Sequence, residues 1–355
     1  MKMKMIPTTL KRSLPLVITV WACVLCIVQP AGATDVIVPG ERWLDNQGTP
    51  INAHGGGVLY HDGVYYWYGE AKSDFTYRSP GVGWDCYRTE AGGVSCYSST
   101  DLLNWHFEGI ALEPDTVHTF SDIHPTMVIE RPKVVYNAKT HQFVMWMHID
   151  NHNYEKASAG VAVSDSPTGP FRFLGSIRPN GQMSRDITLF KDDDQKAYIL
   201  YSSEGNATLH IALLSDDYLH PTTTYTRQFI DQSREAPAIF KRNGHYYIIT
   251  SGCTGWDPNE AEWAVADQVM GPYKSMGNPC RGEHADKTFY SQSTFVLPIV
   301  GTDEYVMMFD RWNKHDLINS RYVWLPIHFD GNELTIPWKA AWQLPTINTH
   351  DTAQH

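Results

Sequence analysis

The chain has 355 residues, and its 39 acidic residues outnumber its 28 lysine and arginine residues, giving a formal net charge of −11. An acidic surface argues against nucleic-acid binding, because proteins that bind nucleic acids present a basic patch or stripe. The charge does not argue against a neutral substrate.

The first 33 residues have the organisation of a secretory signal peptide. A basic start (residues 2–12) precedes an apolar run (residues 14–28), and Ala31-Gly32-Ala33 supplies small residues for a cleavage site. A retained membrane anchor is the alternative, but the apolar run is short compared with the roughly 20 residues that span a bilayer. We therefore expect an exported protein, secreted or periplasmic, with no membrane partner after cleavage and a mature chain of residues 34–355.

Five units of similar internal order follow along the mature chain. Each has a short apolar strand, a polar turn and a second strand rich in aromatic residues, which is the pattern of a β-hairpin. The paired strands are expected at 58–60 with 64–68, 134–136 with 142–147, 187–190 with 197–201, 238–240 with 245–250, and 294–299 with 304–309. A weaker two-strand pattern follows each of the first four hairpins.

The spacing of the units predicts their arrangement. The matching aromatic residues Tyr60, Tyr136, Phe190 and Phe240 are separated by 76, 54 and 50 residues. Four strands per unit, repeated in this way, are typical of the blades of a β-propeller. Five units fill the mature length, so the sequence predicts an all-β fold, a five-bladed β-propeller, as one domain over residues 34–355. A stacked β-sandwich is the alternative, but it does not explain the shared order.

Three units begin with a carboxylate next to an arginine. Glu130, Asp186 and Glu235 lie four to six residues before the matching aromatic residue. Because the inner strands of a propeller line its axis, these carboxylates can meet in one pocket. An opposite charge keeps one carboxylate ionised, whereas clustered like charges raise the pKa of another. Paired carboxylates with separated pKa values are what hydrolysis of a glycosidic bond requires. Ordinary surface ion pairs are the alternative for any single residue.

Two segments carry a family resemblance: DITLFKDDDQKAYILY at 186–201 and REAPAIFKRNGHYYIIT at 234–250. They resemble the third and fourth blades of glycoside hydrolase family 43, and the resemblance covers essentially the whole mature chain. It implies a five-bladed propeller that inverts the anomeric configuration. It also implies that Glu235 is the general acid, which protonates the leaving oxygen, and that Asp186 tunes the pKa of this acid and orients it.

The first unit departs from the family pattern. The general base of the family is an Asp at the start of the first inner strand, a position that falls at Gly56 or within one or two residues of it, and residues 52–60 contain no Asp or Glu. The Asn-Ala-His-Gly lead-in resembles a branch with the same absence, the exo-β-1,3-galactanases. That resemblance implies that Gln292 replaces the base as an imidic-acid tautomer, and that Glu130 is a further functional glutamate. Since a neutral amide is a poor base, Glu130 is the alternative.

Four further residues are candidate contacts to the sugar. Trp256 and Tyr68 offer aromatic faces on which sugar rings stack. Glu70 ends the first hairpin and can accept hydrogen bonds from sugar hydroxyls, and Asn52 belongs to the lead-in of the same hairpin. Most aromatic residues in a propeller pack in the core, which is the alternative for each of them.

Four cysteines remain in the mature chain: Cys86, Cys96, Cys253 and Cys280. In an exported chain they suggest two disulfides, and proximity in the sequence favours Cys86–Cys96 and Cys253–Cys280, with free buried thiols as the alternative. The 16 histidines show no H-E-x-x-H spacing, and there is no glycine-rich phosphate loop. We therefore expect no catalytic metal, no cofactor and a monomer.

Together these features predict a secreted, inverting exo-glycosidase that releases galactose from a polysaccharide, β-1,3-galactan. An α-L-arabinofuranosidase or β-xylosidase of the same family is the alternative enzyme, and the missing first-strand Asp is evidence against it. A carbohydrate-binding propeller that has lost catalysis together with its base is the alternative outside the enzymes.

Overall fold

The computed structural model describes Met1 and residues 36–345. The predicted signal peptide and its boundary at residue 33 therefore lie outside the described residues, except for Met1. The described part is β-structure with three short 3₁₀ helices, and the all-β prediction is confirmed. The helices are η1 (Pro179–Gly181), η2 (Ala285–Tyr290) and η3 (Leu317–Asn319). No helix in these residues is long and apolar enough to cross a membrane.

Four sheets each contain four antiparallel strands that follow one another in the sequence. The first comprises β1 (His54–His61), β2 (Val64–Arg78), β3 (Tyr87–Ser99) and β4 (His106–Leu112). The second comprises β5 (Val128–Asn137), β6 (Gln142–Asp150), β7 (Ser158–Ser164) and β8 (Arg172–Ile177). The third comprises β9 (Ile187–Lys191), β10 (Ala197–Ser203), β11 (Thr208–Leu214) and β12 (Pro221–Gln228). The fourth comprises β13 (Arg234–Arg242), β14 (His245–Gly252), β15 (Glu262–Ala266) and β16 (Lys274–Gly277).

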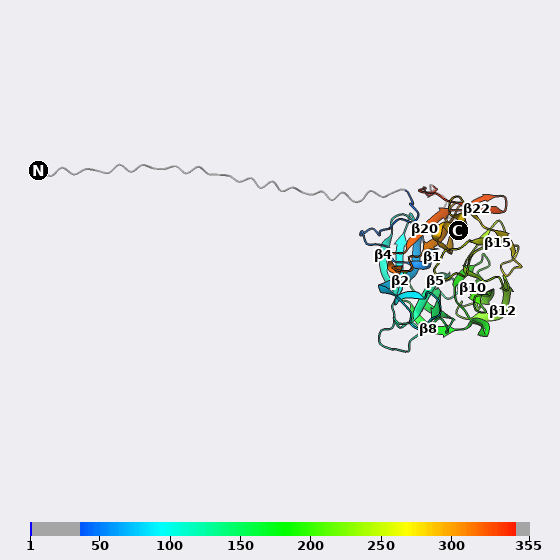
Figure 1. Ribbon diagram of the computed structural model, residues 1–355, viewed down its shortest axis with the longest axis horizontal. Coiled ribbons are helices and arrows are strands. Elements are labelled where there is room, and N and C mark those ends of the chain that lie inside the picture. Colours follow the sequence, from blue (N-terminus) through cyan, green and yellow to red (C-terminus); the bar gives the residue numbers. More distant parts are fainter. Residues whose placement is uncertain (2–35, 346–355) are drawn as a thin grey trace. The chain divides into compact units, whose positions relative to one another are not determined.

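Two further sheets have three strands each. The fifth sheet comprises β18 (Gln292–Pro298), β19 (Tyr305–Arg311) and β20 (Arg321–Pro326). The sixth comprises β17 (Cys280–Arg281), β22 (Glu333–Pro337) and β21 (His328–Asp330), in that order. Figure 1 shows the sheets following one another around a centre, with β1 and β5 near the middle and β4, β8 and β12 towards the outside.

The prediction of five blades is wrong, because the described chain forms a β-propeller of six sheets. The sixth sheet is absent from the prediction because a pairing between distant segments creates it. Strand β17 lies beside β22 in parallel, with Cys280 opposite Ile336. A parallel pair is not joined by a tight turn, so no local hairpin pattern reveals it.

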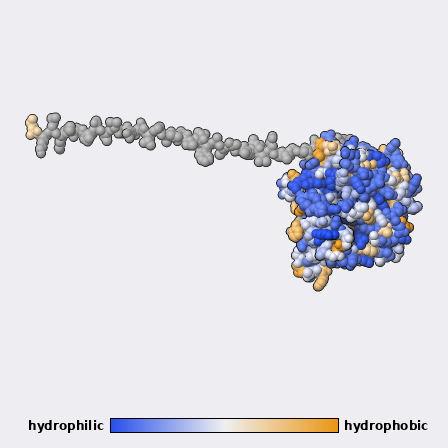
Figure 2. All heavy atoms as spheres, in the orientation of Figure 1, coloured by the Kyte–Doolittle hydropathy of each residue, from blue (hydrophilic) through white to orange (hydrophobic). Residues whose placement is uncertain are grey.

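The apolar core is divided among the spaces between neighbouring sheets. One cluster joins the first and second sheets, another the second and third, and another the third and fourth. The fourth, fifth and sixth sheets share a cluster that includes Cys280 and Ile336. A last cluster joins the first sheet to the fifth, for example Trp67 to Trp324, and this closes the ring. Figure 2 shows a mostly hydrophilic outer face.

Candidate active site

A cavity of about 500 Å³ opens where the starts of several inner strands meet. All four residues predicted to be catalytic line it: Glu130, Asp186, Glu235 and Gln292. Two of the four predicted sugar contacts, Glu70 and Trp256, line it as well. Six of the eight predicted site residues therefore lie together, although they are spread over more than 220 positions of the sequence.

A repeated backbone irregularity places these side chains. Strands β5 and β13 each contain one extra residue after the site residue, between Glu130 and Lys133 and between Glu235 and Ala238. The residue that follows the acid has a positive φ in both strands, 56° in Arg131 and 52° in Ala236. Such β-bulges bend a strand and redirect its side chains, and they are frequent beside active sites. The bulge thus turns each acid towards the cavity.

Glu235 is buried, and both of its carboxyl oxygens have hydrogen-bond partners. Gln292 Nε2 donates to Oε1 at 3.1 Å, and Asn206 Nδ2 donates to Oε2 at 3.1 Å. Burial first, and then the negative charge of Asp186, raise the pKa of Glu235 to about 8 against the opposing charge of Arg131. Glu235 therefore carries a proton at neutral pH, which is the state that a general acid needs.

Asp186 is tied to the backbone of this acid. Its Oδ2 accepts a hydrogen bond from the Ala236 N–H at 3.1 Å, and it lies 3.2 Å from Arg131 Nη2. Its own sequence neighbour, Arg185, instead donates to the Tyr154 carbonyl oxygen at 2.9 Å. The arginine paired with Asp186 therefore comes from another sheet. The positions of the arginines in the sequence did not reveal this pairing.

Both the amide oxygen and the amide nitrogen of Gln292 have two hydrogen-bond partners. Its Oε1 accepts from Arg131 Nη2 at 2.6 Å and from Trp312 Nε1 at 2.9 Å. Its Nε2 donates to Glu235 at 3.1 Å and to Ser251 Oγ at 3.0 Å. Because Arg131 and Trp312 can only donate, the amide oxygen must face them. Both lone pairs of this oxygen are therefore engaged in the ordinary amide form.

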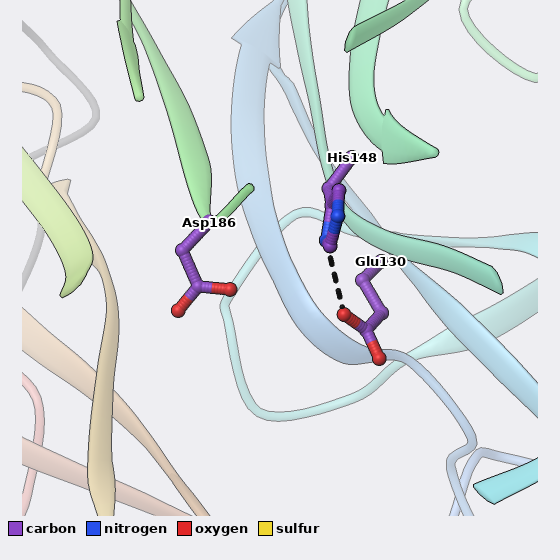
Figure 3. A group of neighbouring side chains, drawn as sticks. All are labelled: Glu130, His148 and Asp186. Atoms are coloured by element: carbon purple, nitrogen blue, oxygen red, sulfur yellow. Dashed lines mark hydrogen bonds and ion pairs between the residues drawn. The ribbon is translucent and has the colours of Figure 1, made fainter. Parts of the chain in front are cut away.

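Glu130 has the opposite protonation state from Glu235. Tyr154 donates to its Oε1 at 2.6 Å, and His148 Nδ1 lies 3.1 Å from its Oε2 (Figure 3). Burial would raise the pKa of Glu130, but the hydrogen bond and positive charge of His148 outweigh it and lower the pKa to about 2. The cavity therefore holds one protonated and one ionised carboxyl group.

The three side chains in Figure 3, Glu130, His148 and Asp186, offer atoms within 4.8 Å of one another, a spacing compatible with a metal ion. Both ring nitrogens of His148 are already directed at carboxylates, Nδ1 at Glu130 and Nε2 at Asp150. An imidazole that donates from both nitrogens has no lone pair for a metal. The donor set therefore does not fit a metal site in this protonation state.

The glycines of the first inner strand leave room for a neighbouring carboxylate. Strand β1 has the same bulge, between His54 and Gly57, with Gly55 at φ 59°. His54 therefore occupies the place that Glu130 and Glu235 hold in their strands, but it faces Asp310 at 3.4 Å. A Cβ on Gly55 would lie only 2.1 Å from Glu70 Oε1. The carboxylate that enters the cavity here therefore comes from β2.

The next two glycines are needed for the close approach of other groups. A Cβ on Gly56 would lie 1.7 Å from the Tyr68 carbonyl oxygen, and one on Gly57 would lie 2.7 Å from Lys133 Cδ. Lys133 is buried, and its ammonium donates to the Gly55 carbonyl oxygen at 2.8 Å. Burial, and then the charge of Arg131, lower the pKa of Lys133 to about 7. The Gly-Gly-Gly segment thus accommodates Glu70, β2 and Lys133.

Glu70 is buried beside the ammonium group of Lys72, a partner that differs from those of Glu130 and Glu235. Its Oε2 lies 2.5 Å from Lys72 Nζ, and its Oε1 accepts from the Arg131 N–H at 3.2 Å. Burial raises the pKa of Glu70, and the charge of Lys72 opposes this effect.

The other two predicted sugar contacts, Tyr68 and Asn52, do not line the cavity. Tyr68 is fully buried between the first and second sheets, and its hydroxyl donates to the Pro167 carbonyl oxygen at 2.5 Å. Asn52 exchanges two hydrogen bonds with the backbone of Lys72, at 2.8 and 3.0 Å. Tyr68 therefore packs in the core and Asn52 is bonded to the first sheet, and neither lines the cavity.

Several functional contacts were not predicted from the sequence: His148, Tyr154, Asn206, Ser251 and Trp312. Two of them follow a simple rule of register. His148 is the cross-strand partner of Glu130, and Ser251 is the partner of Glu235. Pairing each acid with its partner in the second strand of the hairpin would have identified these positions. Tyr154, Asn206 and Trp312 lie outside the strands, where no pattern of periodicity marks them.

The prediction of two disulfides is not borne out by the structure, in which Cys86, Cys96, Cys253 and Cys280 are all free. Cys96 lies in the core between the first and second sheets, whereas Cys86 precedes β3. Cys280 is packed between the fourth, fifth and sixth sheets, and Cys253 lines the cavity. Nearness in the sequence favoured the wrong arrangement, because the two members of each pair lie in different environments.

Comparisons with known proteins identify the family of the chain. Residues 56–294 match the model of glycosyl hydrolases family 43. A solved family GH43 β-1,3-galactosidase with galactodeoxynojirimycin is 45% identical, covering 87% of this chain and all of that one, with a TM-score of 0.80. The exo-β-1,3-galactanase from Phanerochaete chrysosporium with galactose is 36% identical, covering 87% of this chain and 68% of that one, with a TM-score of 0.77.

Two further proteins are also similar to the chain. The exo-β-1,3-galactanase from Clostridium thermocellum is 38% identical, covering 88% of this chain and 67% of that one, with a TM-score of 0.77. A xylan 1,3-β-xylosidase from Vibrio sp is more distant, 23% identical over 200 residues, and the match spans only 36% of its length and 51% of this chain. The chain therefore belongs to glycosyl hydrolase family 43 and is a glycoside hydrolase that resembles the exo-β-1,3-galactanases of that family.

Proposed function

We propose that this glycoside hydrolase is a secreted, inverting exo-enzyme that releases galactose from β-1,3-galactan, with Glu235 as general acid. The observation that carries the proposal is the pair of opposite protonation states in one cavity, Glu235 with a pKa of about 8 and Glu130 with a pKa of about 2. The choice of substrate is supported by the named activities of relatives that are 36–45% identical in sequence to the chain.

In the proposed reaction, Glu235 gives its proton to the glycosidic oxygen as the bond from the anomeric carbon to that oxygen breaks. A water molecule attacks the anomeric carbon from the opposite face and loses one proton to a base. Asp186 supports the first step, because its charge raises the pKa of Glu235 and its hydrogen bond to Ala236 fixes the backbone next to the acid. The ionised carboxylate of Glu130 also favours the positive charge that develops on the sugar ring.

We assign the role of base to Glu130 in preference to Gln292. Both were candidates from the sequence, and their surroundings distinguish them. Gln292 Oε1 already accepts from Arg131 and Trp312, so an imidic-acid form would direct an O–H group at two donors. Glu130 is an ionised carboxylate, and its two hydrogen bonds leave further acceptor capacity on its oxygens.

The function is tested with purified mature protein and β-1,3-galactan. We expect release of free galactose, initially as the α-anomer, which proton NMR recorded during the first minutes of reaction distinguishes from the β-anomer. Aryl α-L-arabinofuranosides and aryl β-xylosides serve as comparison substrates. Faster turnover of either one would favour the alternative enzyme, and binding of galactan without release of any sugar would favour a non-catalytic propeller.

The base is tested by replacing water with a nucleophile that needs no base. In Glu130→Ala, sodium azide added to an aryl β-galactoside should restore turnover and give α-galactosyl azide, because the azide ion attacks the anomeric carbon directly. Gln292→Ala is the matched variant and should not be restored. Rescue of Gln292→Ala alone would contradict the assignment of Glu130.

Export and oligomeric state are part of the proposal. The basic and apolar segments of residues 2–28 support cleavage after Ala33. N-terminal sequencing of protein recovered from outside the cytoplasm should begin at Thr34. Light scattering coupled to size exclusion should give the mass of one mature chain.

A further inference from the structure

A row of three charged side chains begins at the wall of the cavity, with Glu130 and His148, and ends at Asp150. Asp150 Oδ2 is 2.9 Å from His148 Nε2, and His148 Nδ1 is 3.1 Å from Glu130 Oε2. The side chains of Asp150 and His148 are 0% and 1% exposed, whereas that of Glu130 is 14% exposed at the cavity. The row therefore runs from the protein interior to a group that can meet substrate.

The inner end of the row is anchored to the backbone. Asp150 Oδ1 accepts from the N–H groups of Asn151 and Ala157, both at 3.0 Å. These bonds hold the carboxylate, and the carboxylate in turn holds the imidazole ring. Glu130 is also held on its other oxygen by the Tyr154 hydroxyl at 2.6 Å.

The charge of the row follows from its hydrogen bonds. Both ring nitrogens of His148 face carboxylates, so both must carry protons and the ring is a cation. Burial opposes this charge, but the bonds to Asp150 and Glu130 outweigh it and raise the pKa of His148 to about 10. Asp150 is ionised for the same reason: burial works against its charge, and His148 outweighs that and lowers its pKa.

Other charged groups also face Glu130. On β2, the positive charge of Lys72 lowers the pKa of Glu130, and the negative charge of Glu130 raises the pKa of Glu70. On the side of β9, an oxygen of Asp186 lies within 4.8 Å of Glu130. Without His148, Glu130 would share the cavity with two other carboxylates and keep only Lys72 and the Tyr154 hydroxyl to stabilise its charge.

We propose that His148 and Asp150 are positioning residues that hold Glu130 ionised and in one orientation towards the attacking water. The inference rests on the proposed function, in which Glu130 is the base. His148 does not touch the substrate; it acts through the carboxylate of Glu130, and Asp150 acts through His148. When Glu130 takes the proton from water, the imidazolium keeps both of its protons, so the row orients the base without relaying the proton.

The test is the pH profile of kcat/KM on β-1,3-galactobiose for the full mature enzyme and two variants. In His148→Gln the acidic limb should move up towards the ordinary glutamate pKa of about 4.3, so that activity falls below pH 5 where the unaltered enzyme is still active. Asp150→Asn should move the limb in the same direction by a smaller amount, because His148 then keeps one carboxylate partner of two. The basic limb, set by Glu235, should stay near pH 8 in both.

The chain offers a matched control outside the cavity. His210 is equally buried and pairs with Glu204, with Nε2 2.8 Å from the carboxylate, and neither residue lines the cavity. His210→Gln should leave both limbs unchanged, whatever it does to the melting temperature. A loss of activity in His148→Gln that is the same at every pH, with the acidic limb in place, would overturn the positioning role.

Glu130→Gln separates this inference from the proposed function. Full activity in Glu130→Gln would show that Glu130 is not the base and would contradict the proposed mechanism itself. If Glu130→Gln is inactive but His148→Gln and Asp150→Asn leave both limbs of the pH profile in place, Glu130 remains the base. That result would refute only the positioning role of His148 and Asp150.

Discussion

The first and fourth inner strands begin with the same backbone and with different chemistry. In both β1 and β13 a bulge follows the first site position, with a positive φ at Gly55 and at Ala236. In β13 the position before the bulge holds Glu235, which enters the cavity directly. In β1 it holds His54, which is buried against Asp310, and Glu70 from β2 occupies the space beside the next residue, Gly55.

The difference shows that the bulge fixes the position at which a side chain enters the cavity. The local sequence then determines which strand supplies that side chain. Glu235 depends on its own strand, and its pKa is set by burial and by Asp186. Glu70 depends on the absence of side chains in a neighbouring strand. A carboxylate can therefore be lost from one position and another supplied from the next strand without any change in the propeller backbone.

The largest expected effect is at the fourth strand. Glu235→Gln removes the acidic proton but keeps the shape of the side chain, so turnover of β-1,3-galactobiose should fall by about 10²–10⁴-fold. Binding of galactobiose, measured by calorimetry, should change little. A dinitrophenyl β-galactoside, whose leaving group needs no proton, should lose much less activity than the disaccharide does. An equal loss on both substrates would contradict the assignment of the acid.

The corresponding change at the first strand is Gly55→Ala. The new methyl group would overlap Glu70 Oε1 and displace this carboxylate, so kcat/KM should fall by about a hundredfold, the scale of a 1 Å misplacement in an active site. Gly63→Ala is the control, because Gly63 also has a positive φ of 85° but has nothing within 4 Å of a new Cβ. If both variants lose the same activity, backbone strain rather than Glu70 explains the effect.

A smaller effect is expected in the pH dependence of the fourth strand. The charge of Asp186 raises the pKa of Glu235, so Asp186→Asn should lower it. Because the acid works only while protonated, the basic limb of kcat/KM should move from about pH 8 to lower pH, by about one unit. The measurement is the pH profile on galactobiose. A basic limb that stays in place would mean that burial alone sets the pKa of Glu235.

The smallest effect concerns the four cysteines. Since Cys86, Cys96, Cys253 and Cys280 are free thiols, dithiothreitol should change the melting temperature by less than about 1 °C. A disulfide typically contributes about 2–4 kcal/mol, which corresponds to a shift of several degrees for a domain of this size. A clear fall in the melting temperature on reduction would show that at least one disulfide forms in the purified protein.

Local sequence patterns predicted what local interactions determine. The five hairpins follow from alternating apolar residues and turns, and all of them are present, as in β1–β2 and β13–β14. Glu130, Asp186 and Glu235 were found because each lies at or next to the start of an inner strand, whereas Gln292 was found only through the family resemblance. The number of sheets was wrong because β17 and β22 pair over more than 50 residues.

The partners of the site residues were harder to predict than the residues themselves. Arg131 was expected to act on its neighbour Glu130, but it lies against Asp186 and Gln292. Tyr68 follows Trp67 in the same strand, and both are buried on opposite sides of the first sheet. Which face of a strand meets a cavity depends on the neighbouring sheets, and no periodicity within one hairpin contains that information.

The closure of the ring has a consequence for how the enzyme matures. The first sheet is joined to the end of the chain by contacts across very long sequence separations: Tyr322 accepts from the Ala53 N–H at 2.9 Å, and Tyr65 accepts from the Val300 N–H at 3.1 Å. Contacts between such distant residues form late, because a long loop must close first. Gln292 of the fifth sheet contacts both Arg131 of the second sheet and Glu235 of the fourth, so the cavity is complete only after the fifth sheet has folded into place. We therefore expect hydrolysis to begin only after this C-terminal part of the chain has packed against the earlier sheets.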